Sequence, residues 1–249
     1  MKKLILIVLL LVGGVVSGQS VTGTSGLIHI PSARMLEDGQ LVIGAAFIPK
    51  PYFTYANRGG YDGGNKRNNP GFNTYITYGI LPFVELMFRY THELNVPVTP
   101  ETEYFPDRMF SARVRILNEE KKNPSIVLGF HDFGAIILPF DQRVSGPFGG
   151  SINNNFSSSY IVVSKLFRKN FLEFDFSVGY GSDLFKIGTS SFNGIFGGLQ
   201  INAHDFSLIT EYDSQYFHSG IKWRPLNSIN LMLGFWDFKK PTFSFNYLF

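Results

Sequence analysis

The last nine residues of the chain, Pro241–Phe249, constrain its fold most strongly, because aromatic and small polar residues alternate along them. The rings are those of Phe243, Phe245, Tyr247 and Phe249. Side chains of a β-strand point alternately to its two faces, so this period of two predicts a strand with one aromatic face. An exposed sheet edge of this kind would promote aggregation in water. The pattern therefore favours a strand of a closed sheet whose outer face lies in a membrane.

This terminal strand resembles the final strand of bacterial outer-membrane β-barrels. Phe245, Tyr247 and Phe249 resemble the signal through which the barrel-assembly machinery recognises its clients. The resemblance implies that this machinery is a partner and that outer-membrane lipid surrounds the protein. The aromatic content of 16%, with 26 Phe, fits this prediction, because a barrel carries rings on its lipid face and interfacial girdles.

The amino terminus has the pattern of a secretory signal peptide. Two lysines precede an apolar run over residues 4–16, and Val16 and Gly18 occupy the small-residue positions before a cleavage site. We predict cleavage after Gly18, so that residues 1–18 are removed. The run is too short for a membrane-spanning helix of about 20 residues, and no other stretch approaches that length. Membrane insertion is therefore expected through strands.

Composition excludes several classes of site and partner. The chain contains no cysteine, which excludes a lipoprotein anchor, disulfide bonds and thiolate chemistry. Without the two signal-peptide lysines the formal net charge falls from +3 to +1, so the charge does not indicate nucleic-acid binding. We expect no cofactor. About 230 residues remain after the predicted cleavage, enough for one large all-β domain.

Alternation and turn signals predict an all-β fold, a transmembrane antiparallel β-barrel over residues 40–249 with about twelve strands (ten to fourteen). Each candidate is near the ~9–11 residues that a tilted strand needs to cross a bilayer. The candidate strands are residues 40–48, 72–80, 83–91, 107–117, 125–134, 158–167, 171–181, 193–203, 206–213, 215–224, 229–238 and 241–249. Connections rich in Gly, Asn, Pro and Ser alternate with short ones, which is the expected asymmetry between external loops and periplasmic turns. The long connections are residues 49–71, 92–106, 135–157 and 182–192.

Ionisable residues share one parity of these strands, and we predict that they face the lumen. They are Glu85, Arg89, Arg113, Arg115, Glu173, Asp175, Glu211, His218, Lys222 and Arg224. In one interpretation they cross-link the interior as a salt-bridge network without an open pore. In the other, Arg89, Arg113 and Arg115 form a cationic strip along a path for a polar or acidic polymer. The first arrangement is the commoner one in small barrels.

Residues 19–39 precede the first strand without sustained alternation, and we predict that they lie on the periplasmic side or fold into the lumen. Pro31 favours an extended or turn conformation. Ser32 is placed to cap a helical turn over residues 33–36, and Asp38-Gly39 predicts a turn into the first strand. The segment is either a plug or gate, with Arg34 contacting lumen carboxylates, or a brace that closes the barrel floor. Nothing in the turn chemistry requires movement, which favours the brace.

The same segment carries a motif at the positions Gly26, Leu27, Pro31, Ser32, Ala33, Arg34, Asp38 and Gly39. This motif resembles the opening of the YjbH-like family of outer-membrane β-barrel proteins, which are associated with exopolysaccharide and capsule operons. A second likeness joins Glu211-Tyr212-Asp213 to Gly220–Pro225. The resemblance implies an accessory role in exopolysaccharide or capsule production or export in a Gram-negative outer membrane. It also implies polysaccharide and periplasmic export proteins as partners.

Two other functions remain open. One is a general structural barrel or narrow porin without a polysaccharide role. The other is an outer-membrane hydrolase built on His92, His131, Asp132 and Asp213, which lie near the external ends of their strands. No nucleophile elbow and no cluster with metal-ligand spacing is present in the sequence, so we assign no catalytic residue and no metal ligand. We therefore expect a protein that is not an enzyme.

Two weaker features each have a simpler structural interpretation beside a functional one. Glu173 and Asp175 share a strand face, as glycosidase carboxylates do, but Arg168 and Lys169 nearby favour ion pairing. The aromatic cluster in residues 52–55 suits either stacking on sugar rings or an interfacial girdle, and the girdle is the simpler assignment.

Overall fold

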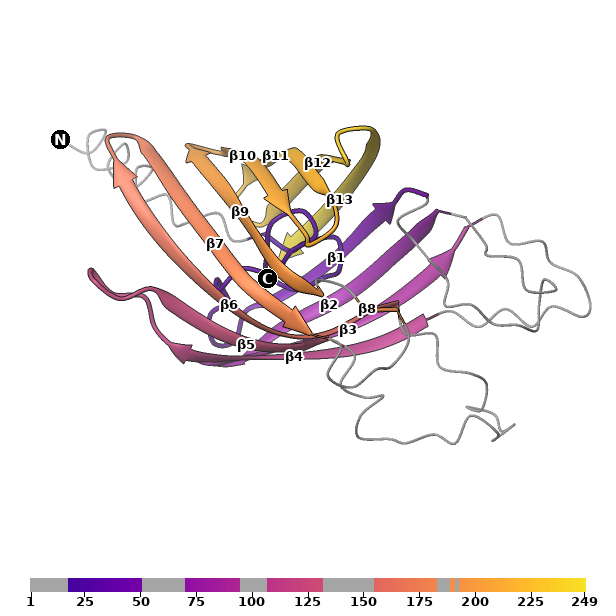
Figure 1. Ribbon diagram of the computed structural model, residues 1–249, viewed down its shortest axis with the longest axis horizontal. Helices are drawn as coiled ribbons and strands as arrows, with labels where there is room; N and C mark the ends of the chain where they lie inside the picture. The colour runs from indigo at the N-terminus through magenta and orange to yellow at the C-terminus, as the bar shows by residue number, and fades with distance from the viewer. Residues whose placement is uncertain (1–17, 51–69, 95–106, 132–154, 183–188, 191–192) are drawn as a thin grey trace, which may run out of the picture.

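The computed structural model describes residues 18–50, 70–94, 107–131, 155–182, 189–190 and 193–249. Within these ranges the regular structure consists of β-strands (Figure 1). In this part of the chain, no helix has the length and apolar character needed to cross a membrane. The aromatic cluster at residues 52–55 and Asp132 of the candidate hydrolase site lie outside the described residues.

The strands form a closed antiparallel barrel, as the sequence predicted. They are β1 (Leu41–Ile48), β2 (Gly71–Leu81), β3 (Val84–Glu93), β4 (Asp107–Leu117), β5 (Ser125–His131), β6 (Asn155–Lys169), β7 (Leu172–Ser182), β8 (Thr189–Ser190), β9 (Gly194–Ala203), β10 (Phe206–Tyr212), β11 (Phe217–Leu226), β12 (Ile229–Trp236) and β13 (Lys240–Leu248). Twelve of them close the ring, and the two-residue strand β8 pairs in parallel with β6 outside it. Strands β1 and β13 complete the ring, with Val42 opposite Leu248 and Phe47 opposite Phe243.

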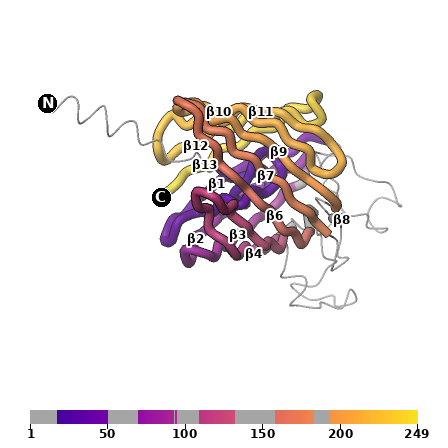
Figure 2. Tube along the Cα trace, turned by 60° about the vertical axis from the view of Figure 1, so that its left-hand side comes forward, coloured from indigo at the N-terminus to yellow at the C-terminus, as the bar shows by residue number. Residues whose placement is uncertain are grey.

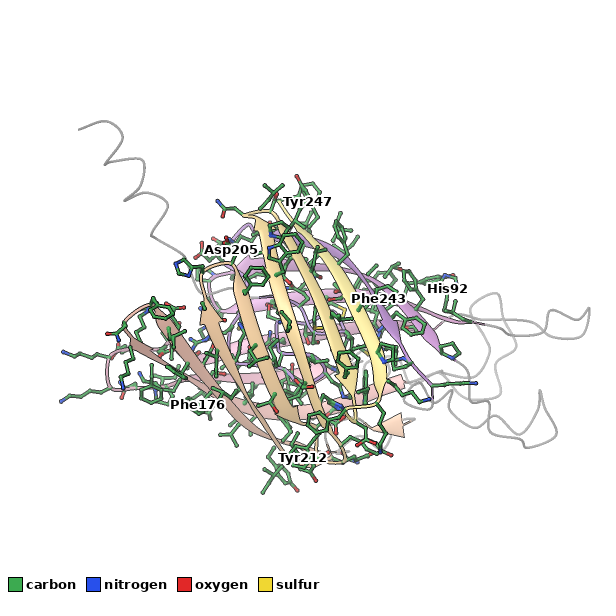
Figure 3. All side chains as sticks on the ribbon, turned by 90° about the horizontal axis from the view of Figure 1, so that it is seen from above. His92, Phe176, Asp205, Tyr212, Phe243 and Tyr247 are labelled. Atoms are coloured by element: carbon green, nitrogen blue, oxygen red, sulfur yellow. The ribbon has the colours of Figure 1, made fainter. Side chains whose placement is uncertain are left out.

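Alternation along the strands separates an apolar exterior from a more polar interior. In β13, Phe243, Phe245 and Tyr247 are 51%, 46% and 37% exposed, whereas Ser244 and Asn246 between them are buried. Figure 3 shows Phe176, Phe243 and Tyr247 directed away from the barrel. An apolar, ring-rich exterior on a closed sheet is the arrangement of a protein that spans a bilayer with strands. The protein is a transmembrane β-barrel of the outer-membrane type.

The two ends of the barrel differ in the length of their connections. At the short-turn rim, short turns join the paired strands, at residues 82–83, 118–124, 170–171, 204–205 and 227–228. At the opposite, long-loop rim lie the ends of strands whose connections run through residues 49–70, 94–106 and 132–154. In Figure 3, Asp205 marks the short-turn rim, and His92 lies at the other end. This sorting follows the predicted one.

Some predicted boundaries were wrong. The strand predicted at 158–167 is β6, which runs from Asn155 to Lys169 because its pairing with β7 continues to the hairpin turn at Asn170. Asn170 adopts a positive φ of 56°, which suits a tight turn. The strand predicted at 125–134 has its described end at His131, and β8 was not predicted.

The helical turn predicted over residues 33–36 is also wrong. Ser32 Oγ accepts a hydrogen bond from the Arg34 backbone N–H (3.3 Å), but no helical hydrogen bond follows. The Ala33 N–H and carbonyl and the Leu36 N–H bond barrel side chains instead, so these groups are not available for a helical turn. The predicted turn at Asp38-Gly39 is present, with Gly39 at φ 78°.

A charge on the outer face should destabilise the barrel strongly. Leu233 lies in the middle of β12 and is 51% exposed. Replacing it by Arg places a guanidinium in hydrocarbon, and we expect Leu233→Arg to lower the free energy of unfolding in lipid vesicles by ~2–4 kcal/mol. Leu233→Met is the matched control and should change stability little. Equal urea midpoints for the Arg and Met variants would contradict a lipid-facing position.

Candidate functional site

The lumen is filled by residues 18–39, named here the plug segment. Residues 18–33 are all buried, and Figure 1 shows the indigo segment inside the ring of strands. Figure 2 shows the same enclosure from a second direction. Isolated bridges between Gln19 and Ser25 and between Gly26 and Pro31 fold it into two consecutive hairpins. Because it has little regular structure, many of its buried backbone groups need partners from the barrel wall.

The ten predicted lumen residues divide by their distance from the rim. Those buried in the interior are Glu85, Arg89, Arg113, Asp175, Glu211, His218 and Lys222. Those half-buried at the short-turn rim are Arg115, Glu173 and Arg224. Most of the buried group contacts the plug segment.

Glu211 holds the second hairpin of the plug segment. Its carboxylate accepts hydrogen bonds from the backbone N–H groups of Ile28 (2.9 Å) and His29 (2.7 Å), with that of Ile30 at 3.4 Å. Three adjacent N–H groups directed at one carboxylate form a strong, charge-assisted anchor. Glu211 is only 2% exposed, so water does not compete for these hydrogen bonds.

Next to this anchor, His29 and His218 share the carboxylate of Asp213. Asp213 Oδ2 lies 2.8 Å from His29 Nδ1 and 2.9 Å from His218 Nε2, and all three residues are buried. The Asp237 backbone N–H donates to His218 Nδ1 (3.1 Å), so Nε2 carries the proton that Asp213 accepts. The indole of Trp236 contacts both imidazoles, with ring centroids at 4.6 and 4.9 Å. The cluster ties the plug segment to the long-loop rim.

Two histidines and an aspartate are also ligands that bind zinc, and their ligand atoms lie within 4.8 Å of one another. In metal centres, the imidazole nitrogen that does not bind the metal usually donates a hydrogen bond to an oxygen. Here His218 Nδ1 accepts one instead. We therefore interpret these residues as a hydrogen-bonded anchor and assign no metal to them.

The anchor changes the ionisation of its members. Burial acts to raise the pKa of Asp213, but the hydrogen bonds from His218 and His29 outweigh it and hold the pKa well below its usual range. Burial lowers the pKa of His29, although Asp213 opposes this effect. Both shifts favour an ionised Asp213 beside a neutral His29 in the folded protein.

A buried ion pair between Glu85 and Arg113 contacts the plug segment at two places, at Ser25 and within residues 32–36. Arg113 Nη1 lies 2.9 Å from Glu85 Oε1, and each side chain is at most 1% exposed. Glu85 accepts hydrogen bonds from Ser25 Oγ (2.7 Å) and from the Leu36 backbone N–H (3.0 Å). Arg113 donates to the carbonyl oxygens of Ser32 and Arg34. The plug segment thus supplies further hydrogen bonds to both members of the pair.

Arg34 of the family motif reaches the wall near the short-turn rim. It forms a bidentate pair with Asp175, with nitrogen–oxygen distances of 2.8 and 2.7 Å, and it also contacts Glu119. Glu119 was not among the predicted lumen residues, because it belongs to a turn, where strand parity does not apply. Glu173, the neighbour of Asp175 on this face, pairs with Arg168 at 2.8 Å. Both carboxylates of the candidate glycosidase pair are therefore engaged in ion pairs.

Further contacts stabilise carbonyl groups of the plug segment. Lys222 Nζ donates to the Gly26 carbonyl (2.6 Å) and lies 3.4 Å from that of Gly18. Asn73 and Thr77 of β2 donate to carbonyls of the first hairpin at 2.7 and 2.6 Å. The family motif and the second family-like patch therefore meet in space, through the contact of Gly26 with Lys222. Glu211 of the same patch binds the backbone of residues 28–30, between the motif positions Leu27 and Pro31.

Sequence reasoning missed the apolar part of the lumen. Val21, Leu27, Ile28 and Ile30 of the plug segment belong to one buried cluster with inward-facing wall residues. These wall residues include Ala46, Ile48, Tyr75, Met87, Met109, Val127, Tyr160, Val162, Phe196, Ile209, Met232 and Trp236. The signal was present in the sequence, because such residues share the strand parity of the charged ones.

A glycine of the wall makes room for this packing. A Cβ atom at Gly198 of β9 would lie 2.6 Å from Leu27 Cδ2, which is closer than carbon atoms approach. The motif residue Leu27 thus occupies a space that only a glycine leaves open.

The candidate hydrolase residues are not assembled into an accessible site among the described residues. His131 is buried, and its Nε2 lies 3.3 Å from Thr24 Oγ1 of the plug segment and 3.4 Å from the Tyr160 hydroxyl. Asp213 belongs to the anchor with His29, and His92 is half-buried on β3.

The family model described as exopolysaccharide biosynthesis protein YbjH (YjbH) matches residues 18–235. The match covers both the plug segment and most of the barrel. The chain belongs to this family. The resemblance inferred from the motif is thereby confirmed, and the protein is a family member with a role in exopolysaccharide. None of the curated protein sequences is significantly similar to the chain.

Three solved structures of outer-membrane proteins match the chain at low identity. The COG4313 outer membrane channel from Pseudomonas putida F1 is 10% identical, with a TM-score of 0.41 over 87% of this chain and 97% of that one. The outer membrane protease OmpT from Escherichia coli is 11% identical, with a TM-score of 0.25 over 87% and 97%. Ail, the attachment invasion locus protein of Yersinia pestis, is 11% identical, with a TM-score of 0.20 over 85% and 99%.

Glu211→Gln should loosen the plug segment. The amide keeps one acceptor oxygen but turns its NH₂ group toward backbone N–H groups, so we expect docking to weaken by ~1.5–3 kcal/mol. Faster protease cleavage within residues 19–39 of the detergent-folded barrel would report it. The control Glu37→Gln changes an exposed carboxyl of the same segment and should leave the rate unchanged. Equal cleavage rates in both variants would contradict the anchor.

Acidification should weaken the His29–Asp213 anchor. A lowered folded-state pKa means that the unfolded chain binds the proton more readily, so the free energy of unfolding decreases as the pH is lowered. We expect the loss to begin below about pH 6.5 through His29 and to grow below about 3.8 through Asp213.

The fluorescence of Trp236 in a Trp223→Phe background measures this transition, because Trp236 contacts the anchor. His29→Gln should remove the change above pH 4, whereas His204→Gln, which alters an exposed turn residue, should not. If the Trp236 fluorescence of the Trp223→Phe protein does not change between pH 7 and pH 4, the prediction is refuted.

Proposed function

We propose that the protein is an accessory component of exopolysaccharide or capsule production or export, and that its lumen is closed in the resting state. The family match over residues 18–235 supports the link to polysaccharide. The observation that carries the closed lumen is the plug segment, whose residues 18–33 are buried inside the barrel.

The contacts of the plug segment favour a brace over a mobile gate. Withdrawing it would remove plug groups from Glu85, Arg113, Asp175 and Glu211. Removing one partner from a buried ion pair typically costs ~3–5 kcal/mol, which applies to the pair of Arg34 with Asp175. The hydrogen bonds of the plug backbone to Glu85, Arg113 and Glu211 would be lost with it. Arg113 of the proposed cationic strip is occupied by Glu85 and by plug carbonyls, so it is not available to line a polymer path.

The proposed partners follow from the location. Outer-membrane lipid surrounds the apolar exterior. We propose that export begins with cleavage near Gly18 and that Phe245, Tyr247 and Phe249 are recognised by the barrel-assembly machinery. Polysaccharide and periplasmic export proteins are the partners expected at the rim that faces the periplasm, which we take to be the short-turn rim.

The competing function is a narrow porin or purely structural barrel without a polysaccharide role. Deletion of the gene should reduce surface polymer, and the intact gene should restore it. The purified barrel should be silent in planar bilayers, because the lumen is filled. If polymer output is unchanged by deletion, the accessory role is wrong. If the intact barrel conducts steadily, the closed lumen is wrong.

A further inference from the structure

A cavity of about 570 Å³ lies at the short-turn rim, between the plug segment and the barrel wall. Its boundary includes Ala33–Glu37 of the plug segment, the β4–β5 turn and the β11–β12 turn. Glu37, Asn118 and Asn227 at its edge are exposed, so the cavity opens to the aqueous side of this rim. Its volume falls within the ~300–1,000 Å³ of typical small-molecule sites.

The lining of the cavity is rich in groups that match sugar hydroxyls. Side-chain amides both donate and accept hydrogen bonds, as hydroxyls do. The amide residues are Gln19, Gln40, Asn118, Asn227, Asn230 and Asn246. Apolar contacts come from Met35, Leu36 and Leu248. Among the described residues that line it, none is aromatic, so recognition would rest on hydrogen bonds and charge rather than on ring stacking.

Two of these amides are incompletely satisfied. Both amide atoms of Asn230 and the Nδ2 atom of Asn246 are buried without a hydrogen-bond partner in the described part of the chain. Asn230 is 9% exposed and Asn246 is 3% exposed. Buried polar atoms of this kind usually bind an ordered water or a ligand, because leaving them unpaired is costly.

The three arginines that line the cavity differ in whether they form ion pairs. Arg34 is committed to Asp175 and Glu119. In contrast, Arg115 donates only to the Pro82 carbonyl (3.0 Å) and to Asn118 Oδ1 (3.4 Å), and neither it nor Arg224 forms an ion pair within the described ranges. Arg224 Nε is buried and unpartnered there. Glu37 and Glu119 also line the cavity, but two guanidinium groups that are not ion-paired favour an anionic ligand.

We propose that this cavity binds a short segment of an acidic polysaccharide, with Arg115 and Arg224 recognising its carboxylates and the amides its hydroxyls. The proposal rests on the polysaccharide role proposed above and adds the substrate class and the place where it binds. It places the contact at the periplasmic mouth of the barrel, between the plug segment and the wall.

The test is calorimetric titration of the detergent-folded barrel with trigalacturonate, and with maltotriose as a neutral trisaccharide of similar size. We expect trigalacturonate to bind at least about tenfold more tightly, and Arg115→Gln/Arg224→Gln to weaken it by about tenfold or more. The matched control Lys121→Gln/Lys122→Gln removes two cations from an exposed turn of the same rim, outside the cavity. It should leave the affinity unchanged.

A second variant, Asn227→Asp, adds a negative charge at the exposed edge and should also weaken trigalacturonate, which keeps the test decisive if the double variant does not fold. The proposal is overturned if neither sugar binds, if both bind equally, or if the variants bind as the parent does. Binding by a protein whose gene deletion leaves polymer unchanged would refute the polysaccharide role alone. Loss of polymer on deletion without binding would refute the cavity alone.

Discussion

The structure depends on one constraint, which is that a buried segment without regular secondary structure must find a partner for each backbone polar group. In the plug segment these partners are the segment's own backbone and side chains of the wall, several of them charged. Glu211 accepts hydrogen bonds from adjacent N–H groups, and Lys222 and Arg113 donate to carbonyls. Glu85 accepts hydrogen bonds from Ser25 and Leu36. The lumen charges would be costly if they were unpaired in so dry an interior. Plug and wall therefore stabilise each other.

Strand parity explains how much of this arrangement the sequence predicts. A period of two determines which face each residue takes, so the barrel, its approximate strand number and the inward position of residues such as Glu85 and Glu211 follow from alternation alone. Parity does not determine what a lumen contains. Met87, Met232 and Trp236 lie on the same face as the charges, and only the fold shows that they belong to one buried cluster with Leu27 and Ile28.

Local signals failed where tertiary contacts compete with them. Ser32 has the chemistry of a helix cap, yet Ser125 and Ser164 of the wall take the hydrogen-bonding groups of Ala33, and no helical turn forms. Likewise, Asp213 and His131 suggested a rim site, but each contacts a plug residue, His29 and Thr24 respectively. Their partners are more than a hundred residues away in the sequence, and no local pattern encodes such pairings.

The path of the plug segment has a topological consequence. It enters beside Lys222 at Gly18, and it leaves through Glu37–Gly39, where the Gly39 backbone N–H bonds the Gly79 carbonyl at 2.8 Å. Both points lie toward the same mouth of the barrel. Because both ends of the plug segment lie at this mouth, the segment would leave the lumen through the same mouth. Any displacement of the plug segment would therefore start at that mouth, where both of its ends are held.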